Sequence, residues 1–269
     1  MKWDTTQLKQ IEDQELKRIE IETMKAIHSF CESNHLRYYL WGGTLLGAIR
    51  HNGFIPWDDD IDIAMPRPDF EKFVRSFDTE EYGVSYCETD DRHPYWHAKV
   101  YDKNTIKLEN IYRKKGFALG VDVDIFALDT YDDFDVVMKS ARWRRHLTTQ
   151  YRFSLKLGTT SIKRGLIGFY ARNIRGFDAN KTALAANKEA QAYGAKGSGL
   201  MLYADSNLQK PLRLEQSWFA KRILHKFEEE EFYIPSNYDA LLRACYGDYM
   251  TPPPKEKQIT HHSFVAYYK

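Results

Sequence analysis

The chain has 269 residues, 43% of them apolar, which is enough to bury a sizeable core in one domain or two small ones. Its formal net charge of +1 at pH 7 gives no reason to expect nucleic acid as a partner of the whole chain. It has no run of about 18 apolar residues that could cross a bilayer, no apolar signal core at its start, and three scattered cysteines without a CxxC pair. We therefore expect a cytoplasmic protein with reduced thiols, without a structural zinc site or a disulfide framework.

The first predicted element is a helix over residues 5–34. Apolar residues recur along it at close to the helical repeat, with charged residues between them: Leu8, Ile11, Leu16, Ile19, Met24, Ile27 and Phe30. This pattern predicts a helix that packs one stripe on the core. A short strand, residues 38–41, is expected to follow it.

A glycine-containing turn and a short helix come next. Gly42, Gly43 and Thr44 would form a tight turn, and a helix would run over residues 45–51. The N–H groups at a helix start bind anions and glycine lets a phosphate approach closely, so this stretch predicts a phosphate cradle. Arg50, near the end of the helix, would add a positive charge. An ordinary turn is the alternative, because a short glycine motif alone is a weak signal.

Alternating aspartates follow this helix. In a strand, residues two apart point to the same face, so Asp58, Asp60 and Asp62 would share one face. Ile61 and Ile63 would then face the core. Carboxylates so close together repel one another unless a cation lies among them. Hard oxygen ligands favour Mg²⁺, with Mn²⁺ as the alternative ion.

A second acidic strand is predicted over residues 120–128, after a helix at 69–77 and strands at 83–88, 96–101 and 105–108. Asp122 and Asp124 would point to one face, and Val121, Val123 and Ile125 to the other. A carboxylate in such an apolar strand is costly unless it is paired or bound to a metal. We expect Asp124 to complete the metal site. Asp122 is the near neighbour that could take the place of Asp124 as a metal ligand. On the first acidic strand, Asp58 is the near neighbour whose assignment could swap in the same way.

The two acidic blocks carry a family resemblance. Residues 41–51, which read WGGTLLGAIRH, and residues 53–62, which read GFIPWDDDID, resemble the first signature of the LicD family. Residues 121–129, which read VDVDIFALD, resemble its second acidic motif, although Ala127 stands where the family often has proline. Further similarity lies at residues 234–238, 246–250, 252–253 and 261–262, so the resemblance spans most of the chain.

The resemblance implies a fold and a reaction. LicD proteins are phosphocholine transferases of bacterial surface glycans within the nucleotidyltransferase superfamily, so an α/β (α+β) core with a small mixed sheet is implied. The donor would be CDP-choline. The acceptor would be a lipid-linked or polymeric glycan, such as a teichoic acid, lipopolysaccharide or capsule precursor. Fukutin-like ribitol-phosphate transferases are related, so another CDP-alcohol or a sugar phosphate is the alternative donor.

On this basis the site residues receive roles. Asp60 and Asp62 would hold one or two Mg²⁺ ions, and Asp124 would orient or deprotonate the acceptor hydroxyl. Arg50 would neutralise the leaving nucleotide. The resemblance favours a phosphate contact for Lys99, whose alternative is an exposed strand lysine. Choline would need an aromatic cage, for which the candidates are Trp41, Trp57, Tyr95, Trp96 and Tyr101.

Residues 136–177 differ from the rest in charge. They contain ten Lys or Arg, no Asp or Glu, and many aromatic and aliphatic residues. Two basic helices, divided near Gly158, would suit an anionic polymer or the anionic inner face of the plasma membrane. The alternative is an ordinary helical lobe whose charges pair with acidic residues elsewhere.

The last third is predicted to contain a helix at 179–193, a strand at 200–203, a hairpin of strands at 218–225 and 230–234, and a helix at 237–245. We predict a catalytic core at 1–135, an inserted basic helical lobe at 136–199, and a segment at 200–269 that completes the core. His261 and His262 are expected to bind phosphate or form hydrogen bonds.

Two other classes of function stay open. An inactive nucleotidyltransferase-fold module that binds a glycan or a membrane should show a decayed acidic triad, and the triad is intact. A nucleic-acid-directed nucleotidyltransferase should carry basic and aromatic residues along its cleft. We expect no nucleic-acid partner.

Overall fold

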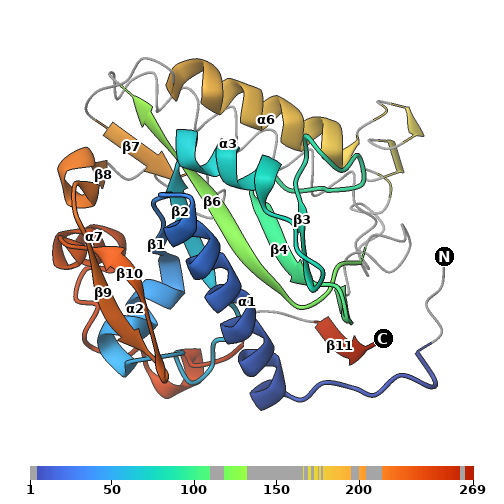
Figure 1. Ribbon diagram of the computed structural model, residues 1–269, viewed down its shortest axis with the longest axis horizontal. Helices are drawn as coiled ribbons and strands as arrows, with labels where there is room; N and C mark the ends of the chain where they lie inside the picture. The colour runs from blue at the N-terminus through green and yellow to red at the C-terminus, as the bar shows by residue number, and fades with distance from the viewer. Residues whose placement is uncertain are drawn as a thin grey trace.

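A mixed β-sheet organises the molecule (Figure 1). The structure is a computed structural model that describes residues 5–109, 118–131, 178–194, 200–203, 214–260 and 264–269, together with residues 166, 169, 170, 173, 174 and 176. Neighbouring strands of the sheet are, in order, β1 (Tyr39–Leu40), β2 (Asp62–Pro66), β6 (Asp122–Tyr131), β4 (Ala98–Asp102) and β3 (Tyr82–Ser85). β7 (Leu200–Tyr203) pairs with the far end of β6, and β8 (Leu214–Glu215) pairs with β7.

β6 is the central strand, and its apolar and acidic residues alternate as predicted. Val123 and Ile125 are fully buried. β6 pairs in parallel with β2, where Asp62 is the register partner of Asp124. It pairs antiparallel with β4, where Lys99 is the partner of the same Asp124. The three polar residues therefore occupy neighbouring positions across three strands.

Helices cover the sheet and its ends. α1 (Asp13–Ser33) and α3 (Arg67–Ser76) lie over one face, and α6 (Ala179–Gly194) crosses near β6 (Figure 1). On the β1 side lie α2 (Gly42–His51), the β9 (Arg222–Phe227) and β10 (Glu230–Pro235) hairpin, and α7 (Tyr238–Tyr246). Two short 3₁₀ helices, η1 (Gln216–Phe219) and η2 (Lys255–Lys257), complete the helical elements described. No helix among the described residues is long and apolar enough to cross a membrane.

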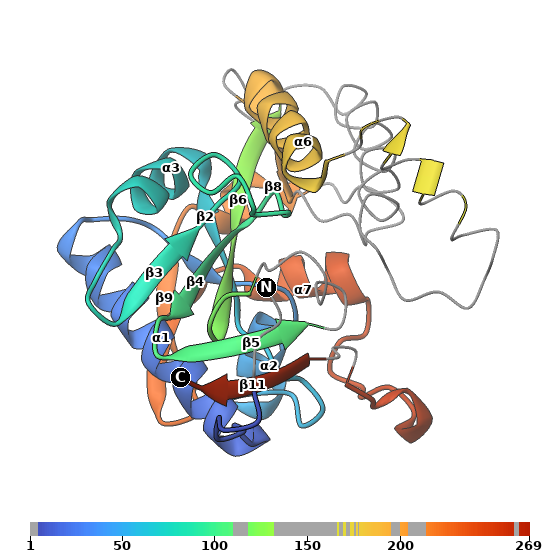
Figure 2. The same cartoon turned by 90° about the vertical axis from the view of Figure 1, so that its right-hand side faces the viewer.

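A separate two-stranded sheet joins distant segments. β5 (Thr105–Glu109) pairs antiparallel with β11 (Phe264–Tyr268), as Figure 2 shows. Residues ahead of α1 hold β11 on its other edge, since the Ile11 N–H donates to the Ala266 carbonyl at 2.9 Å. This backbone pairing explains why the predicted helix at 5–34 begins only at Asp13.

The hairpin turn reaches the loop that follows α2. The Glu228 N–H donates to the Asn52 carbonyl at 2.8 Å, and the Glu228 carboxylate accepts from the Phe54 N–H at 2.9 Å. A side chain at Gly53 would overlap Glu228, because its Cβ would lie 2.1 Å from Oε1. The loop that leads into the aspartates is therefore fixed by a turn far along the chain.

The mixed α/β class is confirmed, and two boundaries near the aspartates differ from the prediction. α2 begins at Gly42, so the expected turn is the first turn of the helix. β2 begins only at Asp62, so Asp58 and Asp60 do not lie on the strand. The Asp58 N–H donates to the Ile55 carbonyl at 2.8 Å, which closes a turn and delays the strand. Of the predicted basic lobe at 136–199, the structure describes α6, which matches the helix expected at 179–193, and six single positions before it. The lobe as a whole stays a prediction.

Candidate active site

A buried lysine links two carboxylates of β6, Asp122 and Asp124. Lys99 Nζ donates to Asp124 Oδ1 and to Asp122 Oδ2, both at 2.5 Å. The lysine is only 6% exposed, so the alternative of an exposed strand lysine is wrong. Lys107, on β5, donates to the other oxygen of Asp122 at 2.6 Å. Asp122 is thus held between two lysines, whereas the Asp124 side chain is 20% exposed and lies beside Asp62.

The loop before β2 gathers three more carboxylates. One oxygen from each of Asp58, Asp59 and Asp60 lies within 4.8 Å of the others, and all three residues are partly exposed. Gly42 and Gly43 approach this group closely. A Cβ on Gly43 would lie 2.6 Å from Asp58 Oδ2, and a Cβ on Gly42 would lie 3.1 Å from Asp62 Oδ2. The start of α2 therefore lies directly against the carboxylates.

Asp62 and Asp124 have opposite pKa shifts. Burial raises the pKa of Asp62 well above its usual value of 3.8, and the carboxylates of Asp60 and Asp124 raise it further. Burial alone would also raise the pKa of Asp124. The positive charge of Lys99, with a smaller contribution from His97, outweighs burial and holds that pKa well below 3.8. The surroundings of Asp62 on β2 therefore disfavour its ionised form, whereas those of Asp124 on β6 favour it.

These oxygens are suited to a hard divalent cation. The loop supplies three convergent carboxylates, and Asp62, whose pKa is raised first by burial and then by the charges of Asp60, Asp124 and Asp58, lies next to them. Mg²⁺ binds such oxygen ligands and would relieve this repulsion. Asp58, Asp59, Asp60 and Asp62 are therefore the residues that could hold a metal, with Asp124 next to them.

The start of α2 is tied to β2 by Thr44. Its hydroxyl accepts a hydrogen bond from the Asp62 N–H at 2.8 Å, and the residue is 3% exposed. The first N–H groups of a helix have no acceptor within the helix, and here the helix starts beside the acidic group. Gly42 has φ +55°, a left-handed conformation that glycine tolerates best. The phosphate cradle at Gly42, Gly43 and Thr44 stays a prediction.

Arg50 lies toward the C-terminal segment. Its Nη1 donates to the Tyr249 carbonyl at 2.9 Å. Its predicted role toward a leaving nucleotide stays a prediction. His261 and His262 lie outside the described residues.

Four polar residues of this region were not assigned by sequence reasoning: Glu20, Asp59, His97 and Lys107. His97 shares a strand face with Lys99, and its Nε2 lies 3.3 Å from Asp124 Oδ2. Alternation along the segment before β4 was therefore an available signal for it. The strand predicted here would direct Asp59 to the face opposite Asp58 and Asp60, but the chain makes a loop that brings the three carboxylates together.

Glu20 is the least expected of the four. It is 0% exposed, and neither carboxylate oxygen has a hydrogen-bond partner among the residues described. Burial raises its pKa well above the usual value, Lys107 lowers it, and Asp60 and Asp122 raise it. Glu20 lies on α1 one turn from Leu16, inside the apolar stripe, and that position was the available signal.

Of the aromatic candidates for a choline cage, two lie near Asp124. Trp41 is 4% exposed and packs on Phe219 in the core. Tyr95 stacks on the His97 ring, with centroids 4.8 Å apart and an interplanar angle of 25°. Trp96 contacts the same ring edge-on at 6.4 Å. Tyr95 and Trp96, just before β4, thus lie near Asp124 through their contacts with His97.

Comparisons with known proteins identify the family of this chain. The family model for the LicD/FKTN/FKRP nucleotidyltransferase domain matches residues 35–170. The lipopolysaccharide cholinephosphotransferase LicD of Haemophilus influenzae is 30% identical over 253 residues, which cover 89% of this chain and 92% of that protein. The ribitol 5-phosphate transferase FKRP of Homo sapiens is 46% identical over 44 residues, 16% of this chain and 9% of that protein. The chain therefore belongs to the LicD/FKTN/FKRP nucleotidyltransferase family and is a phosphotransferase.

Proposed function

We propose that this protein transfers phosphocholine from CDP-choline to a sugar hydroxyl of a bacterial surface glycan, in a reaction that depends on Mg²⁺. One observation carries the proposal. The register pair Asp62 and Asp124 lies beside the oxygen cluster of residues 58–60 and the start of α2. The relative that covers most of the chain is a cholinephosphotransferase that acts on lipopolysaccharide, which supports the donor and the acceptor class.

The carboxylates of Asp58, Asp60 and Asp62 would hold the ion, with Asp59 as a further oxygen donor. When bound, Mg²⁺ would neutralise the charge of the donor diphosphate and orient it. The N–H groups at Gly42 and Gly43 would contact phosphate oxygens next to it.

Asp124 would orient the acceptor hydroxyl. The acceptor oxygen attacks the choline-side phosphorus, the bond from that phosphorus to the bridging oxygen breaks, CMP leaves with the bridging oxygen, and the hydroxyl proton passes to solvent. Because its pKa is low, Asp124 is a weak base, and alignment of the hydroxyl is its larger contribution. Lys99, which donates to both Asp122 and Asp124, would hold the Asp124 carboxylate ionised and in place, and its expected phosphate contact stays a prediction.

The direct test is a donor panel. Purified protein is incubated with Mg²⁺, an acceptor glycan mixture, and CDP-choline, CDP-ribitol, CDP-glycerol or a nucleoside triphosphate, and the products are identified by mass spectrometry. We expect CMP and a phosphocholine-modified glycan only with CDP-choline. Transfer from CDP-ribitol instead would favour the second candidate donor, which the similarity to FKRP supports. Transfer of a nucleotide would overturn the proposed reaction class.

The acceptor could lie at a membrane surface, and residues 136–177 are the proposed contact. Among them the described side chains of Leu166, Phe169, Tyr170 and Ile174 are 50–66% exposed. Exposed apolar groups among ten basic residues suit an anionic interface. We expect co-sedimentation with anionic vesicles at low salt, release as salt rises, and little retention on neutral vesicles. Absence of sedimentation at low salt would overturn this contact.

A further inference from the structure

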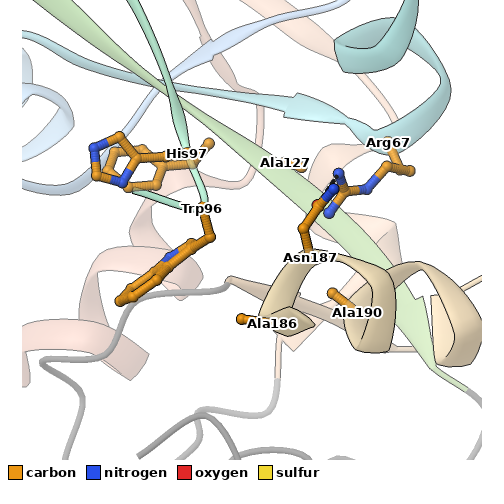
Figure 3. Close-up of a pocket in the computed structure, with 8 residues that line it drawn as sticks. Arg67, Trp96, His97, Ala127, Ala186, Asn187 and Ala190 are labelled. Carbon is orange, nitrogen blue, oxygen red and sulfur yellow. Dashed lines mark hydrogen bonds between the residues drawn. The ribbon is translucent and has the colours of Figure 1, made fainter. Parts of the chain in front are cut away.

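The two halves of the acidic site are built on different kinds of backbone. Asp124 lies on the central strand, which pairs on both edges, and His97 beside it packs on Phe126 with ring centroids 4.7 Å apart, in the group of side chains that Figure 3 shows. Residues 58–60 lie instead on the loop between α2 and β2, residues 52–61, which we call the aspartate loop. Its three carboxylate oxygens lie within 4.8 Å of one another and repel. The aspartate loop therefore needs contacts from outside it to keep this arrangement.

The turn between β9 and β10 supplies such contacts. The Glu228 N–H donates to the Asn52 carbonyl at 2.8 Å, and the Glu228 carboxylate accepts from the Phe54 N–H at 2.9 Å. The Phe54 ring also packs edge-on against Phe227 of the same hairpin, with centroids 5.0 Å apart. The hairpin thus holds the start of the aspartate loop by two hydrogen bonds and one ring contact.

Both main chains at this contact have an uncommon conformation. Asn52 has φ +57° and Glu228 has φ +56°, in the left-handed region that residues other than glycine seldom adopt. Such conformations persist where the surrounding structure determines them. The turn and the aspartate loop are therefore shaped for each other at the hydrogen bond that joins Glu228 to Asn52.

A short and closely packed path leads from this contact to the aspartates. Ile55 is 6% exposed, and its carbonyl accepts from the Asp58 N–H at 2.8 Å. On its other side, Asp58 lies so close to α2 that a Cβ on Gly43 would be 2.6 Å from Asp58 Oδ2. The position of Asp58 thus depends on the end of the loop that Glu228 holds.

We propose that Glu228 is a positioning residue for the divalent cation, whose carboxylate keeps residues 58–60 in the arrangement that binds the ion. The inference rests on the metal site of the proposed function and deepens it. Groups that orient metal ligands without touching the ion typically change metal affinity by about 10–100-fold. Because the Glu228 side chain acts through a hydrogen bond that it accepts, an amide oxygen at the same place would serve as well, whereas a methyl group would not.

The test measures Mn²⁺ binding to the purified full chain by electron paramagnetic resonance, with Mn²⁺ as the probe for the proposed Mg²⁺. Glu228→Ala should weaken Mn²⁺ binding by about tenfold. Glu228→Gln loses the charge but keeps the acceptor oxygen, so its Kd should stay within about twofold of the wild type. Glu229→Ala removes the same charge at an exposed position of the same turn and should also stay within about twofold.

Gly53 gives a second test that removes no hydrogen-bonding group. A Cβ on Gly53 would lie 2.5 Å from Cδ and 3.2 Å from Cγ of Glu228, with Oε1 closer still. Gly53→Ala should therefore displace the carboxylate and weaken Mn²⁺ binding about as much as Glu228→Ala does. All three overlapping atoms are absent from Glu228→Ala, so the double variant should bind Mn²⁺ no more weakly than either single variant.

Thermal unfolding in EDTA shows that each variant is folded at the temperature of the titration. Equal Mn²⁺ affinity of the wild type and Glu228→Ala overturns the positioning role alone. So does a loss in Glu228→Gln as large as that in Glu228→Ala, or a double variant in which the two single losses multiply. Wild-type Mn²⁺ binding that Asp62→Asn leaves unchanged overturns the metal site of the proposed function as well.

Discussion

Asp62 and Asp124 are register partners on neighbouring strands, yet their environments shift their pKa values in opposite directions. The β6 carboxylates have their counter-ions built into the chain, because Lys99 and Lys107 donate to them at 2.5–2.6 Å. On the β2 side, burial raises the pKa of Asp62, and neighbouring carboxylates raise it further. The negative charge of Asp122 and Asp124 is thus balanced by lysines of the protein itself. The carboxylates on the β2 side gain most from an external cation. The β2 carboxylates would bind the ion, while those of β6 keep the site ordered.

The largest expected effect is on transfer activity. Asp62→Asn and Asp124→Asn should each lower kcat/KM by about a thousandfold, ~4 kcal/mol, because one removes an ion ligand and the other the group that aligns the acceptor. Steady-state transfer at controlled Mg²⁺ measures this. Asp78→Asn, whose side chain is 77% exposed, is the control and should stay within twofold of the wild type. Activity of Asp62→Asn within a few fold of the wild type would discard the metal assignment.

The next effect tests the built-in counter-ion. Lys99→Met should cost about 3–5 kcal/mol of unfolding free energy, because it leaves buried Asp122 and Asp124 without their shared cation. Urea unfolding measures the change. Lys103→Met, which breaks an exposed pair with Asp78, should cost under about 1 kcal/mol. Equal losses for the two lysines would mean that the β6 half is not balanced as described.

The sharpest test of the contrast between Asp62 and Asp124 is the sign of the change in unfolding free energy when each is replaced. In EDTA at neutral pH, Asp62→Asn should raise the unfolding free energy and Asp124→Asn should lower it, each by about 1 kcal/mol or more. The folded-state pKa of Asp62 lies above 3.8, so its contribution to stability falls as pH rises from 3.8 through the raised value. The folded-state pKa of Asp124 lies below 3.8, so its contribution is present above 3.8 and is lost as pH falls below it. Thermal unfolding from pH 5 to 8 would contradict this if both variants shifted Tm in the same direction.

The smallest effect concerns Glu20, which adds a buried carboxyl near the same charges. Because its folded-state pKa is raised, it destabilises the protein increasingly as pH rises above its usual value of 4.5. Glu20→Gln should therefore raise the unfolding free energy at pH 7.5 by about 1 kcal/mol, with a smaller gain at pH 5. Glu22→Gln, at a 46% exposed position on the same helix, should change it by less than about 0.5 kcal/mol. A loss of stability in Glu20→Gln would show that the carboxylate is paired when the protein is folded.

Local periodicity explains what could be predicted from the sequence. The alternation around Asp124 and the isoleucines at 61 and 63 follow from the two-residue repeat of a strand, and the structure buries those isoleucines fully. The pairing of Lys99 with Asp124 depends instead on the register between strands that are far apart in sequence. Periodicity predicts a strand for the aspartates at 58–60, because it does not reveal that the Asp58 N–H closes a turn onto the Ile55 carbonyl. Glu20 shows the same limit, since a helical repeat gives the face of a residue and not the charges opposite it.

The contact between Glu228 and the loop at Phe54 shows that the segment that folds together differs from the segment that the family model matches. The family model matches residues 35–170, yet the carboxylate that fixes the loop before the aspartates lies at position 228. α1 lies before the matched segment, and β7, which pairs with β6, lies after it. The stretch that is recognisably shared among relatives is therefore shorter than the stretch that must fold together. A fragment cut at the ends of the match would carry the signature aspartates without the turn that holds their loop, so the inherited motif and the cooperative folding unit have different boundaries.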